Sequence, residues 1–297
     1  MRISDSMLQS NFLSNLNYSK ERMEELQTQI ASNNKINKPS DSPSGAAKIM
    51  RFRADVTQTK DFVGNIDNSL AFIQESMRGL EYVLDESTKI LVDLAQIQNP
   101  SNDGNMESFA NQIDSSLNII LEAANIEFNG QYIFGGTDDS NVPYGFTADG
   151  SAVELKATDV SGDRKVKISK NITQNINVPG SELFGNIDGT DIFNKLIEIR
   201  DNLRNGIKPT DADVKAIEDF SSSVRDHLSE VGNVSNKLDS SKVILGNQIL
   251  TLEGLISKES EVDLAAATIQ LQNYDYSLQL SYKMSSMFLT RSLLDYL

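Results

Sequence analysis

Two long stretches of the sequence repeat an apolar residue every seven positions, and this repeat constrains the fold more than any other feature. A sustained seven-residue repeat is typical of helices that pack side by side as coiled coils. We therefore expect two long helices, over residues 44–98 and 210–256, packed against each other. The first repeat contains Ile49, Val56, Val63, Leu70, Met77, Leu84 and Leu91, with a companion row at Phe52, Ile66, Ile73, Leu80 and Leu94. The second repeat contains Ile217, Val224, Val231, Leu238, Leu245 and Leu252.

Shorter amphipathic helices are predicted on either side of the long ones. Apolar residues at a spacing of three or four indicate helices over residues 5–34, 105–128 and 190–205, and from residue 260 to the C-terminus. Pro39 and Pro43 break the pattern after the first helix, and the polar stretch 99–104 reads as a turn. At 129–130, an Asn-Gly pair suited to positive φ is expected to end the helix predicted over 105–128.

Residues 131–187 have a different composition, rich in Gly, Asp, Asn and Thr. Apolar residues at even positions, from Val166 to Val178, indicate strands. The predicted fold is mainly α: an elongated antiparallel coiled-coil helical bundle formed by the N- and C-terminal halves, with a small inserted β-rich domain. The predicted parts are terminal assembly helices at 1–43 and 257–297, a helical rod domain at 44–136 and 188–256, and the β-rich domain at 137–187.

The two terminal helices carry more apolar surface than one chain can readily cover. The C-terminal helix has two apolar rows, one through Ile269 and Tyr276 and another through Leu271 and Leu278. Apolar rows without a partner favour association between copies, although completion of the bundle within one chain is the alternative. Without partners these ends should be mobile in a monomer. The predicted assembly interface consists of Phe12, Leu16, Met23, Leu26, Ile30, Leu264, Ile269, Leu271, Tyr276, Leu278, Leu280, Met287, Leu294 and Leu297.

The charge and composition exclude several classes of function. The net charge is −15, which disfavours nucleic acid and anionic membranes as partners. There is no cysteine for disulfides or thiolate chemistry. The sequence lacks an apolar run of about 18 residues that could span a membrane, and its start lacks the apolar core of a cleaved signal peptide. The ends are nearly neutral, so copies could approach each other there while the acidic middle keeps the chain soluble.

Candidate catalytic and metal-binding residues are few. His227 is the sole histidine, and we interpret it as a surface residue. Asp138-Asp139 and the stretch 188–191 could be read as calcium loops, but neither has the alternating acidic ligands of an EF-hand, so turns are the preferred interpretation. No phosphate-binding loop or nucleophile motif occurs. The sequence therefore predicts no catalytic, cofactor-binding or metal-binding residues, and a structural protein that is not an enzyme.

Two segments resemble the bacterial flagellin family, in its hook-associated protein 3 branch. The loop Ile36-Asn37-Lys38-Pro39-Ser40-Asp41-Ser42-Pro43 is similar to that branch's N-x-P-S-D-D-P pattern, with Ser42 in place of the second Asp. The segment from Asn129, Gly130, Tyr132, Ile133 and Phe134 to Gly136 resembles its N-G-x-Y-I-F-x-G pattern. The last nine residues, 289–297, are similar to its closing pattern. The departures at Ser42 and at residues 32–35 put the local loop geometry in question.

The resemblance implies a structural subunit of the bacterial flagellum. It would form a ring at the hook–filament junction, between hook-associated protein 1 and flagellin. It would be secreted by the flagellar type III apparatus, with a cytoplasmic export chaperone on the C-terminal helix. The main alternative is flagellin itself, the filament subunit. An enzyme or binding module in the β-rich domain and a cytoplasmic coiled-coil scaffold are alternatives from other classes.

Overall fold

The computed structural model describes residues 2–185 and 191–294. The chain divides into two compact units, a terminal unit of Met1–Gln58 with Gln248–Leu297 and a central unit of Thr59–Asn247. The long helices α2 (Pro43–Ile97) and α6 (Asp211–Ser260) each contribute residues to both units. Both long helices predicted from the seven-residue repeats are confirmed.

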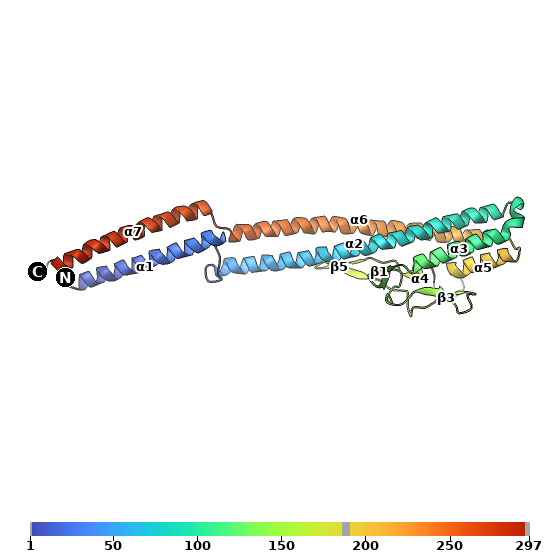
Figure 1. The fold of residues 1–297 in the computed structure, drawn as a ribbon, viewed down its shortest axis with the longest axis horizontal. Helices are drawn as coiled ribbons and strands as arrows, with labels where there is room; N and C mark the ends of the chain where they lie inside the picture. Colours follow the sequence, from blue (N-terminus) through green and yellow to red (C-terminus); the bar gives the residue numbers. More distant parts are fainter. Residues whose placement is uncertain (1, 186–190, 295–297) are drawn as a thin grey trace. The chain divides into compact units, whose positions relative to one another are not determined.

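The terminal unit pairs the first helix with the last. Helix α1 (Arg2–Ser32) lies beside α7 (Leu264–Leu294), as Figure 1 shows at the blue and red ends of the chain. Each helix has apolar residues at helical spacing, which allows one face to be buried against its neighbour. The predicted terminal helices are therefore present and are joined to each other within one chain.

In the central unit, α2 and α6 run antiparallel. The Lys242 ammonium of α6 lies 2.7 Å from the Asp67 carboxylate of α2. At the other end of the pair, Gln98 donates its side-chain N–H to the carbonyl of Pro209 at 2.8 Å. An early residue of α2 therefore faces a late residue of α6, while the residue just after α2 faces the residues before α6, as expected for an antiparallel coiled coil.

Two shorter helices, α3 (Met106–Ala124) and α5 (Ile192–Arg204), pack against each other in the same unit. The turn predicted at 99–104 is the 3-10 helix η1 (Pro100–Asn105), and the Asn99 side chain caps it by accepting from the Ser101 N–H at 3.0 Å. The predicted helix over 105–128 is wrong at its end. Helix α3 stops at Ala124, and its last predicted residues are a strand instead.

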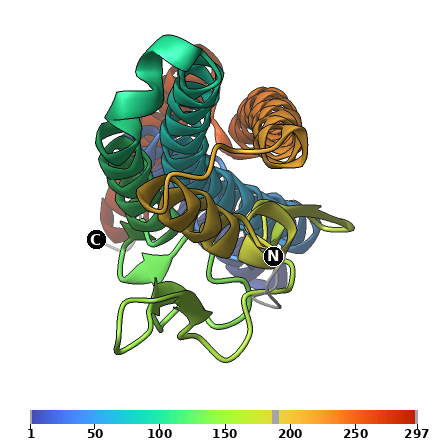
Figure 2. The same cartoon turned by 90° about the vertical axis from the view of Figure 1, so that its right-hand side faces the viewer.

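Within the described residues, the strands form three small antiparallel hairpins. In Figure 2 the green strands, which belong to the first two hairpins, lie below the helices of the central unit. The fold-class prediction, a mainly α chain with a small β-rich insert, is confirmed; the alternation that predicted a strand as far as Val178 is wrong, because β6 ends at Asn175. The pairs are β1 (Glu127–Phe128) with β2 (Gln131–Tyr132), β3 (Tyr144–Phe146) with β4 (Val153–Leu155), and β5 (Lys165–Ser169) with β6 (Ile172–Asn175).

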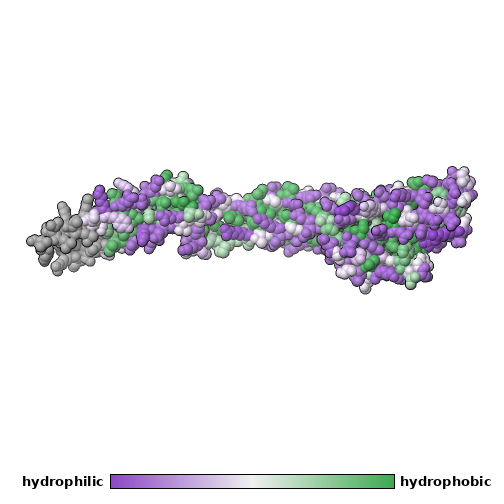
Figure 3. Space-filling view, in the orientation of Figure 1, coloured by the Kyte–Doolittle hydropathy of each residue, from purple (hydrophilic) through white to green (hydrophobic). Residues whose placement is uncertain are grey.

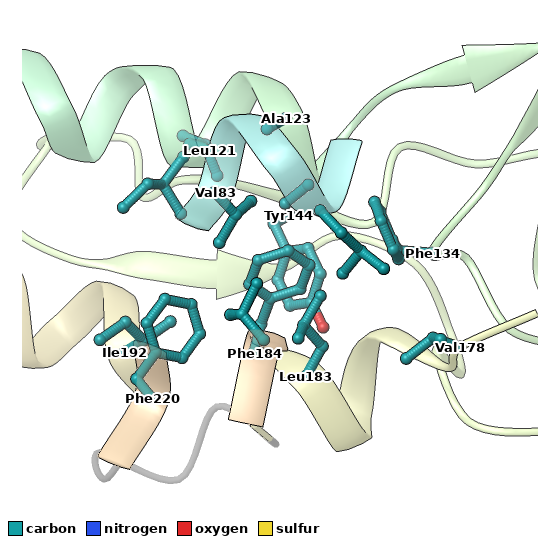
Figure 4. Packing of buried hydrophobic residues seen from close by; sticks show 14 of the residues in the cluster. Val83, Leu121, Ala123, Phe134, Tyr144, Val178, Leu183, Phe184, Ile192 and Phe220 are labelled. Atoms are coloured by element: carbon teal, nitrogen blue, oxygen red, sulfur yellow. The ribbon is translucent and has the colours of Figure 1, made fainter. Parts of the chain in front are cut away.

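An aromatic cluster joins the hairpins to the helices (Figure 4). Phe184, which follows the short helix α4 (Gly180–Leu183), stacks on Phe193 of α5 with ring centroids 5.3 Å apart. Phe134 and Tyr144 meet the Phe184 ring edge-on at 5.5 Å. All four rings are almost wholly buried. Edge-to-face contacts of this kind stabilise beyond the apolar area that they bury, so they fix the β-rich insert on its helices.

Candidate assembly surface

One apolar row of α7 faces α1. Ala267 and Leu278 are buried, and Leu271 is half-buried. On α1, the predicted interface residues Phe12, Leu16, Met23 and Ile30 are half-buried and Leu26 is buried. The structure therefore uses most of the α1 stripe, and one of the two α7 rows, to hold the two helices together within a single chain.

The other row of α7 is largely exposed, and we call Ile269, Tyr276 and Leu280 the outer seam. Their exposed fractions are 59%, 63% and 44%, against 5% for Leu278 on the inner row. Leu264, the first residue of the inner row, is 47% exposed. Figure 3 shows apolar surface at the beginning of α7. The side chains of Met287 and Leu294, and residue Leu297 as a whole, lie outside the described residues. In the single chain, α1 therefore covers one of the two apolar rows of α7 and leaves the other exposed.

Helix α1 also has exposed apolar residues outside the predicted interface. Leu13 and Tyr18 are each about half exposed. The Arg22 guanidinium lies over the Tyr18 ring, 5.6 Å from its centroid, and its hydrogen bond to the phenol lowers the pKa of Tyr18. Leu13 and Tyr18 do not follow the apolar spacing of the buried stripe of α1. Their position one step off that stripe was the signal that could have identified them.

The loop between α1 and α2 is organised by Asp41. Its carboxylate accepts backbone N–H groups of Lys38 at 2.8 Å and Asn37 at 2.9 Å, which holds the pKa of this exposed carboxyl below its usual value. Ser42 caps α2 by accepting the Gly45 N–H at 3.2 Å, and Pro43 occupies the first helical position. Ser and Asp are both effective N-caps, so the departure from the family pattern at Ser42 leaves this cap intact.

This loop is tied to the residues that link α6 to α7. Lys35 donates its backbone N–H to the Ser260 carbonyl at 2.7 Å and its ammonium to the Lys258 carbonyl at 3.0 Å. Asn34 and Glu261 form an isolated antiparallel bridge. The ammonium of Lys48 lies 3.2 Å from the carboxylate of Glu259. Backbone hydrogen bonds therefore join the α1–α2 loop to the α6–α7 link, and an ion pair joins the neighbouring ends of α2 and α6.

The second family-like segment is a hairpin followed by core residues. Asn129 and Gly130 have φ of 54° and 79°, so they form the two-residue turn between β1 and β2. Positive φ is as expected there, although the pair closes a hairpin and does not end a helix. Ile133 and Phe134 are fully buried. Tyr132 donates its backbone N–H to the Asp139 carbonyl at 2.7 Å. The residues of this segment therefore attach the β-rich insert to the core of the central unit.

The candidate chemical groups have structural roles where they are described. Asp138 accepts the Thr158 N–H at 2.8 Å and the Asn141 amide at 2.8 Å, as expected of a turn residue. Asp191 caps α5 through the Asn194 N–H at 3.0 Å, whereas residues 188–190 lie outside the described residues. Within the described ranges, no group of three or more metal-ligating side chains is present.

His227, which we expected to be a surface residue, is less exposed than that interpretation implies. Its side chain is only 18% exposed and lines a small cavity.

In the part of the chain that the structure describes, no helix is both long enough and apolar enough to cross a bilayer.

Comparison with known proteins finds a similar helical region and a similar fold. Residues 3–139 match the family model of the bacterial flagellin N-terminal helical region. No curated protein matches the sequence. The fold is similar to that of several solved structures, including the following three. The first is described as a flagellar hook-associated protein from Vibrio parahaemolyticus, with a TM-score of 0.66 and 18% sequence identity. The match covers 74% of this chain and 100% of the Vibrio chain. Hook-associated protein 3 from Legionella pneumophila has a TM-score of 0.62 and 11% sequence identity. The match covers 71% of this chain and 98% of the Legionella chain. FlgL from Bacillus cereus has a TM-score of 0.55 and 20% sequence identity. The match covers 71% of this chain and 100% of the Bacillus chain.

Residues 3–139 are therefore similar to the N-terminal helical region of bacterial flagellins, and the chain joins this region to its C-terminal helices within one fold. Its fold is similar to that of the hook-associated proteins of known structure.

Proposed function

We propose that this chain is a structural subunit of the bacterial flagellum that forms the hook–filament junction and is not an enzyme. The observation that carries the proposal is the outer seam of α7, an apolar row left uncovered on a helix pair that already satisfies its inner row. The family model and the hook-associated fold support this assignment. In the proposal, copies of the chain associate into a ring through paired terminal helices.

The proposed neighbours follow from the family. The ring would lie between hook-associated protein 1 and flagellin. Export would use the flagellar type III apparatus, with a chaperone covering the apolar surface of α7 in the cytoplasm. Exposed apolar residues before assembly are an aggregation hazard, which gives such a chaperone a physical reason. The terminal helices, 1–43 and 257–297, would be mobile in the free monomer and become fixed on assembly.

A pair of charged variants tests the assembly role of the outer seam. Ile269→Lys together with Tyr276→Lys places two buried charges in any interface built on the seam, and burying an unpaired charge is costly. Gln272→Lys with Gln279→Lys is the matched control, because both glutamines are exposed, seven residues apart and on the same helix. The seam variant should fold normally and fail to restore filaments in a strain lacking the chain. Normal filaments with the seam variant would refute the proposal.

The phenotype of the deletion separates this proposal from flagellin itself. Loss of a junction subunit should release unpolymerised flagellin into the medium, whereas loss of the filament subunit should remove filament protein altogether. Removal of residues 273–297 should likewise leave a folded monomer that cannot support filament growth. Electron microscopy with a labelled antibody should find the chain at the hook–filament boundary and not along the filament.

A further inference from the structure

The chain contains two Asn-Gly pairs, Asn129-Gly130 and Asn205-Gly206. An asparagine followed by glycine can modify itself, because the unbranched glycine lets its own backbone nitrogen approach the side-chain amide carbon of the asparagine. Both pairs are exposed. The first forms the turn between β1 and β2, whereas the second follows the last residue of α5. The surrounding hydrogen bonds therefore decide which pair can react.

At the second pair, hydrogen bonds hold both of the groups that would react. Gly206 donates its backbone N–H to the Leu203 carbonyl at 3.0 Å. Asn205 donates its side-chain N–H to the Asp201 carbonyl at 2.9 Å. These bonds close the end of α5, where Asn205 is the C-cap residue. Attack of the Gly206 nitrogen on the Asn205 amide therefore requires that both bonds break first.

At the first pair, neither of these groups is held. Among the described residues, no acceptor is bonded to the Gly130 N–H or to the side-chain amide of Asn129. Apart from its chain neighbours, one described atom lies within 4 Å of a Cβ placed on Gly130, an oxygen of the Glu127 carboxylate at 3.9 Å. The turn joins two strands of only two residues each. Strands this short hold a turn weakly, so the rotation that brings the Gly130 nitrogen onto the Asn129 amide needs only a local opening.

We propose that Asn129 is a site of spontaneous deamidation through a cyclic imide, and that the fold protects Asn205 from the same reaction. The Gly130 nitrogen loses its proton to solvent and forms a bond to the side-chain carbonyl carbon of Asn129. The side-chain nitrogen takes up a proton and leaves as ammonia. Water then opens the imide at one of its two carbonyl carbons. One opening gives aspartate, and the other gives isoaspartate, in which the backbone runs through the former side chain. Water is the only co-reactant.

The two products should affect the hairpin differently. Aspartate adds a negative charge and keeps the length of the backbone, and like asparagine it tolerates positive φ. Isoaspartate adds a methylene to the backbone of a two-residue turn, whose length fixes the register of the strands that it joins. Just beyond the turn, the buried Ile133 donates its N–H to the Ile126 carbonyl at 3.0 Å. Isoaspartate at residue 129 should therefore loosen this hydrogen bond, and aspartate should leave it intact.

Peptide mass spectrometry of the full chain tests the proposal, with Asn205 as the internal control. The protein is incubated at mildly alkaline pH, where the backbone nitrogen loses its proton more readily, and is then digested at mildly acidic pH to stop the reaction. In the folded chain, Asn129 should convert at least several-fold faster than Asn205. In guanidinium chloride the two rates should become similar, because the hydrogen bonds at the end of α5 are lost.

Hydrogen exchange on the incubated protein tests the consequence. Exchange protection of the Ile133 amide should fall in the fraction that contains isoaspartate, whereas Asn129→Asp, which has the added charge and an unchanged backbone, should keep it. The proposal is overturned if Asn129 converts no faster than Asn205 in the folded chain, or if the ratio of the two rates is the same in guanidinium chloride.

Discussion

Asparagine side chains close the open edges of the β3–β4 hairpin. Asn125 accepts the Tyr144 N–H at 3.0 Å and donates to the Tyr144 carbonyl at 2.8 Å. On the other edge, Asn194 accepts the Val153 N–H at 3.1 Å and donates to the Val153 carbonyl at 3.3 Å. A primary amide offers the same donor and acceptor as a peptide group. Each asparagine thus replaces one residue of a missing neighbouring strand.

Asn194→Ala should destabilise the central unit. The Val153 backbone is buried, so both its N–H and its carbonyl would lose a partner away from water. We expect a loss of about 1–3 kcal/mol in the free energy of unfolding, measured by urea denaturation. Asn171→Ala, at the exposed tip of the β5–β6 hairpin, is the control and should change stability by no more than about 0.5 kcal/mol. Equal effects of both variants would contradict the role of the Asn194 amide.

Acid should loosen the loop between α1 and α2. Hydrogen bonds from the Lys38 and Asn37 backbone lower the pKa of Asp41 in the folded chain. The stabilisation is therefore present above the ordinary pKa of an aspartate and is lost as the pH falls through the lowered one. NMR should show the amide protons of Asn37 and Lys38 shifting together with the Asp41 carboxyl. In Asp41→Ala these two amides should exchange faster at neutral pH and lose that acid titration.

At the scale of elements, the close packing of the β-rich insert depends on a glycine of the family-like segment. Gly136 has φ of 61°, and a Cβ there would come within 2.4 Å of backbone atoms of Val160 and Ser161. Gly150 has a similar φ of 71°, but a Cβ there would meet nothing within 4 Å. The two positions therefore share the cost of a left-handed backbone and differ in the space around it.

Substituting alanine at these two glycines separates the two costs. Gly150→Ala should lose about 1–2 kcal/mol from backbone conformation alone. Gly136→Ala should lose a further 1–3 kcal/mol, roughly, because the backbone of residues 160–161 must move. Chemical denaturation of both variants measures the difference. Equal losses would mean that the insert relaxes freely around residue 136.

The helices could be predicted from the sequence because their apolar spacing is regular, but one buried row of α2 was missed. Phe62, Val83, Ile90 and Ile97 are buried and fall on a seven-residue row that Ser69 and Ser76 interrupt. Apolar spacing alone does not reveal a row that contains two serines. Helix α2 needs this third row because it is covered on several sides in the central unit, where the core joins helices and hairpins.

The candidate surface was predictable only in part. Two apolar rows on α7 were visible in the sequence, but which row α1 would cover depends on how the two helices meet. Leu278 and Tyr276 are two residues apart, yet one is buried and the other exposed. His227 was assigned to the surface because nothing in its neighbouring sequence indicates the Asn175–Glu182 stretch, which packs against it from a distant part of the chain.

For the whole molecule, the net charge of −15 opposes the association that the outer seam favours. Salt should therefore strengthen self-association. Raising the ionic strength from about 0.01 M to about 0.15 M shortens the screening length from about 30 Å to about 8 Å. Sedimentation should show larger assemblies at the higher salt concentration, and the Ile269→Lys, Tyr276→Lys variant should remain monomeric. Association that weakens with added salt would indicate that ion pairs, and not the apolar seam, hold the copies together.

The asparagine caps of the β3–β4 hairpin also matter in a crowded assembly. An unpaired strand edge is a template on which another chain can add a strand, and repeated addition leads to cross-β fibres. The proposed ring would hold many copies of one sequence at high local concentration, where such growth would be fastest. Because Asn125 and Asn194 occupy both edges from within the chain, neighbouring copies can meet through their helices without their sheets fusing.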